Sequence, residues 1–166
     1  MGTVLSIDEV CAERKAAREQ GKKFVFTNGC FDLLHRGHVE LLKTAKAMGD
    51  LLCVGMNSDT SVRRLKGPRR PVVPEADRAA VLAGLGAVDF VTMFDEDTPA
   101  RIISILRPDV LVKGSDYAMA EIVGRSDVEE AGGVVARIPL YRSLSTEKLL
   151  KEIARRYRDV VDTDLR

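Results

Sequence analysis

The sequence predicts an α/β fold with a doubly wound, mostly parallel sheet of five strands and helices on both faces. Three observations predict it: short apolar stretches alternate with amphipathic ones, glycine and proline separate them, and no stretch repeats. Such alternation implies right-handed crossovers, which place successive strands parallel to one another. A length of 166 residues with 45% hydrophobic residues suits a single domain over residues 1–166.

Each element is predicted from a local pattern. A first helix within residues 1–21 begins with a capping box from Ser6 to Glu9 and ends at Gly21. The expected strands, all short and apolar, are 23–28, 51–57, 89–94, 109–114 and 134–140. Helices are expected over 37–48, 75–86, 98–107, 126–133 and 145–160, the fourth with a capping box from Ser126 to Glu129. Residues 63–74 are expected to form a basic loop broken by prolines, and residues 159–166 a frayed tail.

Composition limits the classes of function. A net charge of +1 gives no general attraction to nucleic acid or membrane, so any recognition of anions must be local. The apolar runs are strand-sized, and the N-terminus lacks the basic-then-apolar order of a signal peptide. The three cysteines lack metal-ligand spacing and suit a reducing compartment. We therefore expect a cytoplasmic protein without nucleic-acid or membrane partners.

The stretch "FTNGCFDLLHRGH", residues 26–38, contains both histidines of the chain. It follows an apolar strand, at the sheet edge where ligands bind in open α/β folds, and a helix starting near Gly37 would direct its positive dipole end there. His35 and His38 can then donate hydrogen bonds to one oxyanion. Ordinary helix-cap histidines are the alternative, and zinc is disfavoured because only Asp32 is nearby as a further ligand. The pattern favours phosphate binding.

These residues resemble the H-x-G-H signature of the cytidylyltransferase-like nucleotidyltransferase superfamily, and "LSTEKLL", residues 144–150, resembles its second signature. The segments "VGMNSDTSVRRLKGPRRPVVPEADR" and "EDTPARIISILRPDVLVKGSDY" are similar to the heptose 1-phosphate adenylyltransferases, which form one unit of ADP-heptose synthases. The similarity covers roughly residues 6–155. It implies a Rossmann-like fold and transfer of AMP from ATP to D-glycero-D-manno-heptose 1-phosphate. The products would be pyrophosphate and ADP-heptose, a precursor of bacterial surface polysaccharide.

The resemblance also implies roles for individual residues. Catalytic roles are expected for His35, His38 and Lys46. Nucleotide or phosphate binding is expected at Thr27, Asn28, Gly29, Phe31, Gly37, Lys66, Arg78, Ser145 and Thr146. Acceptor or ribose binding is expected at Asp32, Lys113, Gly114, Asp116 and Tyr117. Purely structural roles remain open for several of them: a solvated helix face for Lys46, loop capping for Asp32, a strand-end turn for 113–117, and plain helix capping for Ser145 and Thr146.

The basic run "RRLKGPRRP" has three interpretations: a solvated loop, a nucleic-acid surface, or a polyphosphate-binding loop closing over the substrate. Aromatic residues do not interleave it, which disfavours nucleic acid and favours polyphosphate, with Lys66 as the best match to the family. One departure is Leu140, where related cytidylyltransferases place an arginine. Arg142 is displaced by two positions and receives no role.

The triphosphate implies Mg²⁺, held mainly by phosphate oxygens and water, and the sequence names no metal ligands. Because the first helix begins almost at Met1, the heptose kinase that precedes this step is expected to be a separate chain, and a homodimer is common in the superfamily. Three alternatives remain open. They are a cytidylyltransferase or adenylyltransferase for another phosphorylated acceptor such as glycerol 3-phosphate, a non-catalytic nucleotide-binding module, and a DNA-binding protein.

Overall fold

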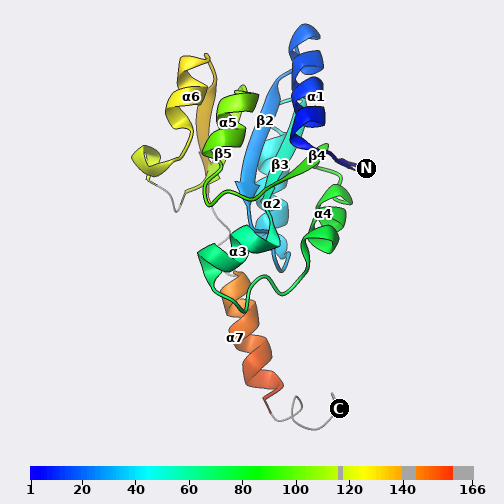
Figure 1. The fold of residues 1–166 in the computed structure, drawn as a ribbon, viewed down its shortest axis with the longest axis vertical. Coiled ribbons are helices and arrows are strands. Elements are labelled where there is room, and N and C mark those ends of the chain that lie inside the picture. The colour runs from blue at the N-terminus through cyan, green and yellow to red at the C-terminus, as the bar shows by residue number, and fades with distance from the viewer. Residues whose placement is uncertain (116–117, 140–144, 159–166) are drawn as a thin grey trace.

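A parallel sheet of six strands runs through the centre of the computed structural model, which describes residues 1–115, 118–139 and 145–158 (Figure 1). The strands are β1 (Thr3–Val4), β2 (Phe24–Gly29), β3 (Leu51–Asn57), β4 (Phe90–Phe94), β5 (Val110–Gly114) and β6 (Val134–Ile138). The helices are α1 (Ile7–Glu19), α2 (Arg36–Lys46), α3 (Asp59–Lys66), α4 (Glu75–Ala83), α5 (Ala100–Leu106), α6 (Arg125–Glu130) and α7 (Thr146–Arg156), with a 3-10 turn at Met119–Glu121.

The chain builds this sheet outward from β2 in two directions. The order across the sheet is β1-β4-β3-β2-β5-β6, so β3 and β4 are added on one side before the chain crosses to add β5 and β6 on the other. Where connections leave neighbouring strands in opposite directions, a crevice opens at their carboxyl ends. Here that point lies between β2 and β5, where Thr27 is opposite Val112.

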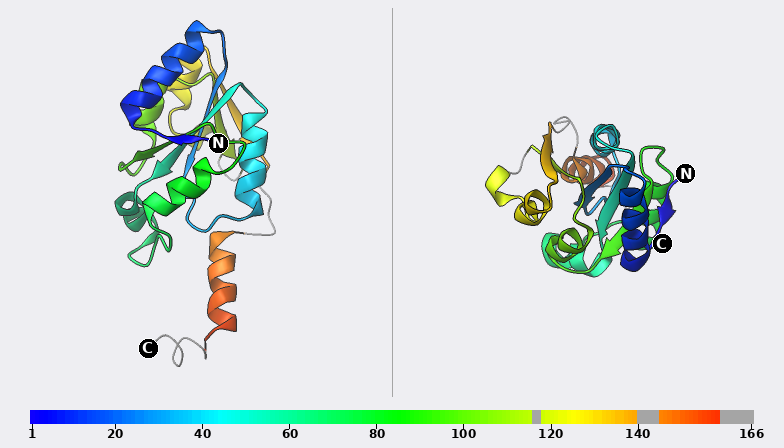
Figure 2. Two further views of the ribbon diagram at one scale, coloured as in Figure 1. Left: turned by 90° about the vertical axis from the view of Figure 1, so that its right-hand side faces the viewer. Right: turned by 90° about the horizontal axis from the view of Figure 1, so that it is seen from above.

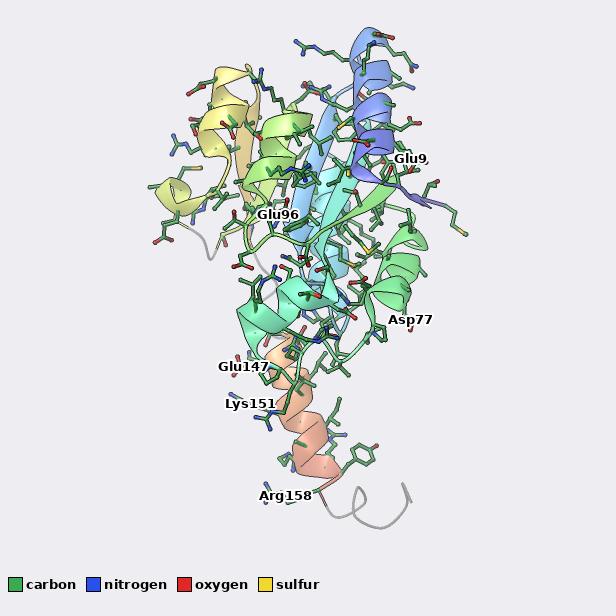
Figure 3. The ribbon with its side chains drawn as sticks, in the orientation of Figure 1. Glu9, Asp77, Glu96, Glu147, Lys151 and Arg158 are labelled. Carbon is green, nitrogen blue, oxygen red and sulfur yellow. The ribbon has the colours of Figure 1, made fainter. Side chains whose placement is uncertain are left out.

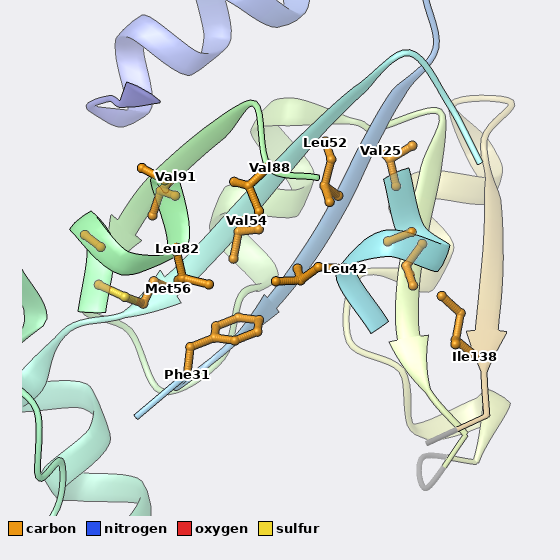
Figure 4. Close-up of a cluster of buried hydrophobic side chains, with 14 of the residues drawn as sticks. Val25, Phe31, Leu42, Leu52, Val54, Met56, Leu82, Val88, Val91 and Ile138 are labelled. Atoms are coloured by element: carbon orange, nitrogen blue, oxygen red, sulfur yellow. The ribbon is translucent and has the colours of Figure 1, made fainter. Parts of the chain in front are cut away.

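Helices cover both faces of the sheet (Figure 2). On one face, α2 and α4 pack against the sheet through Leu42 and Leu82, which belong with Val25 and Val54 to a single buried cluster (Figure 4). On the other face, α1, α5 and α6 form a second cluster with the remaining strand side chains, including Phe24. Successive residues of β2 therefore enter different cores, which explains why this strand is apolar throughout its first three positions rather than alternating.

A partly buried ion pair fastens α1 to the second face. The Arg14 guanidinium, in a residue only 8% exposed, donates to Asp109 Oδ1 at 2.8 Å and to the carbonyls of Leu106 and Arg107 at 3.3 and 3.0 Å. The second oxygen of Asp109 accepts the Phe24 backbone N–H at 2.7 Å. One carboxylate thus joins the first helix, the central strand and the turn before β5.

The five expected strands are confirmed, and β1 is an addition. With two residues it is too short to show a period in the sequence, and it is defined only by its parallel pairing with β4. Residues 63–66 are also different from the prediction, because they belong to helix α3 rather than to a loop. The signal was present at Ser58, whose Oγ accepts the Ser61 N–H at 3.0 Å and caps that helix.

The capping box expected from Ser126 to Glu129 is wrong. Helix α6 begins one residue earlier, and Gly124 is its N-terminal cap with a φ of +80°. A side chain there would be strained, and its Cβ would meet Ile103 Cγ2 at 2.5 Å. The requirement for glycine therefore comes from packing against α5, a contact that lies outside the local pattern.

Helix α7 extends away from the sheet, as Figures 1 and 2 show from two sides. None of its described residues is buried, and Glu147 and Lys151 form a surface ion pair at 2.6 Å one turn apart (Figure 3). The expected tail, 159–166, lies outside the described residues. No helix in the described ranges combines the length and the apolar character needed to cross a membrane.

The hydrogen bonds that Asp109 accepts from α1 and β2 predict an effect on stability. Asp109→Ala leaves the Phe24 N–H without its acceptor and removes the charged partner of Arg14, which keeps only the Leu106 and Arg107 carbonyls, so we expect the free energy of unfolding to fall by about 1–3 kcal/mol. Glu129→Ala removes an exposed i,i+4 partner of Arg125 and should change it by less than about 0.5 kcal/mol. Urea unfolding of both variants measures this, and equal losses would contradict the structural role of Asp109.

Candidate active site

A cleft of about 960 Å³ opens at the carboxyl ends of β2, β3 and β5, beside the first turns of α2 and α7. It lies at the point where the strand order reverses, which is where open α/β sheets bind ligands. The expected site residues that line it are Asn28, Gly29, Phe31, Asp32, His35, Gly37, His38, Lys66, Lys113, Ser145 and Thr146. The fold therefore brings together segments from both ends of the chain.

The turn after β2 depends on Phe31, a buried aromatic residue with a positive φ of 47°. Its ring packs under Gly29, where an added Cβ would meet Phe31 Cε2 at 3.2 Å. The same ring lies 5.3 Å from the imidazole of His38, centroid to centroid, at a tilt of 55°. Gly29 thus admits Phe31 beneath the turn, and Phe31 supports the second histidine of the H-x-G-H motif.

The two histidines form a stacked pair at the start of α2. His35 is the N-terminal cap of this helix, and its Nδ1 accepts the Gly37 N–H at 3.1 Å. Its ring centroid lies 4.0 Å from that of His38, with 25° between the planes. Because Nδ1 of His35 is an acceptor, the neutral ring carries its proton on Nε2, where it can be donated to a ligand.

Both histidines are neutral at neutral pH. Burial, and to a smaller extent the neighbouring His35, lowers the pKa of His38 to about 4. Burial also lowers the pKa of His35. At pH 7 the pair therefore offers hydrogen-bond donors rather than two positive charges, and positive charge in the cleft comes from other side chains.

Cations reach the cleft from three elements. Lys113, at the end of β5, donates from Nζ to Asn28 Oδ1 at the end of β2 and thereby joins the two strands at the switch point. Lys66 lies at the end of α3, and Arg70 lies in the loop that follows. Arg70 was not singled out by the sequence, although it belongs to the basic run.

The other three cations of the basic run do not line the cleft. Arg63 lies 3.9 Å from Asp59, and Arg64 pairs with Asp97 at 2.6 Å on the outside of α3. Arg69 is exposed and does not line the cleft. Of the five cations expected in this run, only Lys66 and Arg70 line the cleft.

Asp32 has a different environment from the one expected for a residue binding acceptor or ribose. Its side chain is 0% exposed, and its two oxygens accept from Arg70 Nε at 2.5 Å and from the N–H groups of Val72 and Val73 at 2.8 and 2.9 Å. Burial alone raises the pKa of Asp32, but these hydrogen bonds outweigh burial and lower it. The carboxylate faces the loop at 67–73, and binding of acceptor or ribose by Asp32 stays a prediction.

Arg78 is likewise structural rather than phosphate-binding. Its buried guanidinium donates to the carbonyls of Cys30, Asn57 and Val73 at 2.5, 3.0 and 3.0 Å, and to Asp59 Oδ1 at 2.7 Å. The residue is 1% exposed and does not line the cleft. All its nitrogen atoms are used to hold the loops around the strand ends, so its expected phosphate contact is corrected.

Lys46 lies at the last position of α2, at the opposite end of the helix from the histidines. Its ammonium group bonds to Asp89 Oδ2 at 2.6 Å and to the Asp50 carbonyl at 2.5 Å. Asp89 also accepts the Leu52 N–H at 2.6 Å, so the lysine helps to tie α2 to the start of β3. The expectation that Lys46 reaches the phosphates is therefore corrected.

Thr27 and Gly114 are buried beneath the cleft, near the ends of β2 and β5. The buried Thr27 donates from Oγ1 to the Val112 carbonyl at 3.0 Å and so fastens β2 to β5, while Gly114 is a buried residue at the end of β5. Neither lines the cleft. Asp116 and Tyr117, expected to contact ribose or acceptor, lie outside the described residues, as do Leu140 and Arg142.

The first turn of α7 closes the cleft from the C-terminal side. Ser145 caps the helix by accepting the Lys148 N–H at 3.2 Å, and Thr146 donates from Oγ1 to the Leu33 carbonyl at 3.4 Å. The helix start is thereby held against the turn that carries the histidines. Glu147 lies beside it and also lines the cleft.

Asn57 is a cleft residue that the sequence analysis missed. Asn57 is the last residue of β3 and lines the cleft, although it is only 4% exposed. Its Nδ2 donates to Ser61 Oγ at 3.0 Å. The position of Asn57 at the end of a strand could have identified it. Asn28, which was predicted, is the second-last residue of the neighbouring strand β2. Among the described residues, no group of three or more His, Cys, Asp or Glu side chains is arranged to hold a metal ion.

The lowered pKa of His38 predicts acid sensitivity. The unfolded chain takes up this proton near the ordinary value of 6.5, and the folded chain only near 4, so stability is complete above pH 6.5 and is lost as the pH falls toward 4. His38→Asn lacks this group. Between pH 7.5 and 4.5 we expect wild type to lose roughly 2–3 kcal/mol more unfolding free energy than the variant. Urea titrations across this range measure the difference, and a difference independent of pH would contradict the buried neutral state.

Two curated relatives are named Bifunctional protein HldE. The one from Geotalea uraniireducens is 52% identical over 150 residues, which cover 90% of this chain and 31% of the relative. The one from Syntrophotalea carbinolica is 54% identical over 140 residues, covering 84% of this chain and 29% of the relative. The chain thus spans less than a third of the length of these two proteins.

Two solved structures share the fold. The lipopolysaccharide core biosynthesis protein from Thermoplasma volcanium has a TM-score of 0.62 and 31% identity, covering 73% of this chain and 99% of that one. A pantoate-beta-alanine ligase from Francisella tularensis, complexed with beta-gamma ATP and beta-alanine, has a TM-score of 0.67 over 99% of this chain and 80% of its own. Its identity is 17%, so that likeness concerns the fold alone.

The family model of cytidylyltransferase-like proteins matches residues 26–157, which run from β2 to the end of α7. The matched region includes both histidines, the loop after α3 and the start of the last helix. It covers well over half of the chain and all the segments that form the cleft. The chain belongs to the cytidylyltransferase-like family.

Proposed function

We propose that this chain is a nucleotidyltransferase that transfers AMP from ATP to D-glycero-D-manno-heptose 1-phosphate, giving ADP-heptose and pyrophosphate. The observation that carries the proposal is the neutral, stacked pair of His35 and His38, which lines one cleft together with Lys66 and Lys113. Two hydrogen-bond donors beside several cations form an environment suited to a polyphosphate.

The proposed chemistry needs no nucleophile from the protein. An oxygen of the sugar phosphate attacks the α-phosphorus of ATP and forms a new P–O bond, while the bond from that phosphorus to the bridging oxygen of the β-phosphate breaks and releases pyrophosphate. The protein positions the two reactants and stabilises the charge on the phosphoryl oxygens. His35 and His38 donate hydrogen bonds to these oxygens, and the positive dipole ends of α2 and α7 lie beside the same cleft.

The choice of acceptor rests on the relatives rather than on the cleft. The proteins named Bifunctional protein HldE are about half identical to this chain over most of its length, and the Thermoplasma volcanium relative is titled as a lipopolysaccharide core biosynthesis protein. The second title supports surface polysaccharide as the destination of the product, and the heptose phosphate is the acceptor that the resemblance to heptose 1-phosphate adenylyltransferases implies. ATP is the nucleotide that the same resemblance implies.

The proposal implies further components. A heptose kinase must supply the sugar 1-phosphate, and we propose a separate kinase in the same pathway. Since the described residues hold no cluster of metal ligands, Mg²⁺ would be bound through phosphate oxygens and water. The nucleotide substrate is consistent with a cytoplasmic location, and a homodimer is the oligomeric state that we propose for the active protein.

A nucleotide and acceptor panel tests the function. Pyrophosphate release is measured with Mg²⁺ and each of ATP, CTP, GTP and UTP, with heptose 1-phosphate set against glycerol 3-phosphate. We expect release only with ATP and the heptose phosphate. Turnover with CTP and glycerol 3-phosphate would instead identify a cytidylyltransferase, and ATP binding without release would indicate a non-catalytic module.

The contribution of the histidine pair is tested by His38→Ala. Removing one preorganised donor from the transition state should lower kcat by roughly 100- to 1,000-fold. Thr44→Ala, on the exposed side of the same helix, is the matched control and should retain the wild-type rate. Equal rates for both variants would contradict a role of the pair in the reaction.

A further inference from the structure

The loop at residues 67–73 is tied to the H-x-G-H turn by one buried carboxylate. Asp32, three positions before His35, accepts hydrogen bonds from two consecutive loop amides, those of Val72 and Val73, and from Arg70 Nε. Its side chain is 0% exposed. A buried carboxylate with three donors holds its partners in one arrangement, so the position of the loop is fixed relative to the histidines.

Arg70 is the part of this loop that faces the cleft. Its side chain is 18% exposed and lines the cleft, and within the described residues its only hydrogen-bonding partner is Asp32, reached through Nε. A guanidinium has five N–H donors in a planar fork. The pairing of Nε with Asp32 therefore orients the fork and leaves the terminal nitrogens available to a ligand.

The other arginines nearby do not share this arrangement. Arg78 is completely enclosed by four protein oxygens, and Arg64 is paired with the acidic side chains after β4. Arg69, the neighbour of Arg70 in the chain, is exposed and lies away from the cleft lining. Of the arginines in the described ranges, Arg70 is the one that lines the cleft.

Glu147, in the first turn of α7, lies close enough to Arg70 for their charges to interact. The pKa of the exposed Glu147 is lowered, mainly by its bond to Lys151, and Arg70 and Lys66 contribute in the same direction. Glu147 also lines the cleft, so the cations of the loop and α3 act on the space beside the start of α7. Phosphate oxygens of a bound ligand would experience the same attraction.

We propose that Arg70 is a polyphosphate-binding residue of this cleft and that Asp32 is the positioning residue that orients it. The inference rests on the proposed function for the identity of the ligand, a nucleoside triphosphate or its pyrophosphate portion. It gives Asp32 a role through Arg70 rather than through the acceptor, and it assigns the phosphate-binding arginine to the loop rather than to α4.

Binding of inorganic tripolyphosphate, measured by calorimetry at a fixed salt concentration, tests the arginine without reference to the acceptor. Arg70→Gln should weaken binding at least roughly tenfold, the range for loss of a charge-assisted hydrogen bond. Arg69→Gln, which removes the same charge from the neighbouring position, should weaken it less than about twofold, as expected for a solvated surface charge. Equal effects of the two variants, or no binding by wild type, would overturn the proposal.

A double-mutant cycle tests the positioning role. Asp32→Asn should weaken tripolyphosphate binding by a factor similar to Arg70→Gln, and adding it to Arg70→Gln should have little further effect. A carboxylate that merely stabilised the fold would instead give losses that multiply. If Asp32→Asn does not fold, Arg70→Lys replaces it: this variant keeps the charge but loses the fork held by Asp32. It should bind several-fold more weakly than Arg69→Lys, and equal affinities would overturn the assignment.

The two levels of the proposal fail separately. A wild-type protein that binds tripolyphosphate through Arg70 but releases no pyrophosphate with heptose 1-phosphate would contradict the proposed function and support the present inference. If instead the wild-type protein releases pyrophosphate with heptose 1-phosphate but the Arg70→Gln variant binds tripolyphosphate like wild type, the proposed function is supported and the role of Arg70 is contradicted.

Discussion

The burial of β2 on both faces is the constraint on which the other parts of the molecule depend. Phe24, Val25 and Phe26 are 0% exposed, so the backbone of this strand has no access to water and must be paired on both sides. Parallel pairing with β3 and β5 satisfies it and aligns the carboxyl ends of all three strands. Polar residues can follow only where the strand leaves the core, which is where Asn28 begins the wall of the cleft.

Buried polar side chains then hold the loops at this edge. Arg78 and Asp32 are charged groups with almost no exposure, and such groups are tolerated only when their hydrogen bonds are complete. Each completes them with loop backbone: Arg78 through carbonyls on three segments, Asp32 through two amides. Charged groups whose hydrogen bonds are all made within the protein hold the loops around the cleft. Arg70, which among the described residues uses only Nε for such a bond, lines the cleft itself.

The electrostatics of the cleft divide the tasks between two kinds of side chain. The histidine rings, 4.0 Å apart, could not both be protonated without strong repulsion, and burial keeps them neutral. Neutral imidazoles can approach one another and still donate hydrogen bonds to the same anion. Lysine and arginine side chains from α3, β5 and the loop at 67–73 supply the positive charge. A local anion site is thereby formed in a chain whose net charge is only +1.

The sequence by itself determined the features that depend on neighbours in the chain: the five longer strands, the helix cap at Ser145, and the turn that ends in His35 and His38. These follow from periodicity, capping and glycine placement within a few positions. Only the tertiary structure decided which charged residues face the cleft. Arg78 and Lys46 are bound to oxygens on other segments, and such pairing is invisible to local pattern because the partners are distant in sequence. The edge strand β1 was decided in the same way, since two residues form a strand only when a neighbouring strand is there to pair with them.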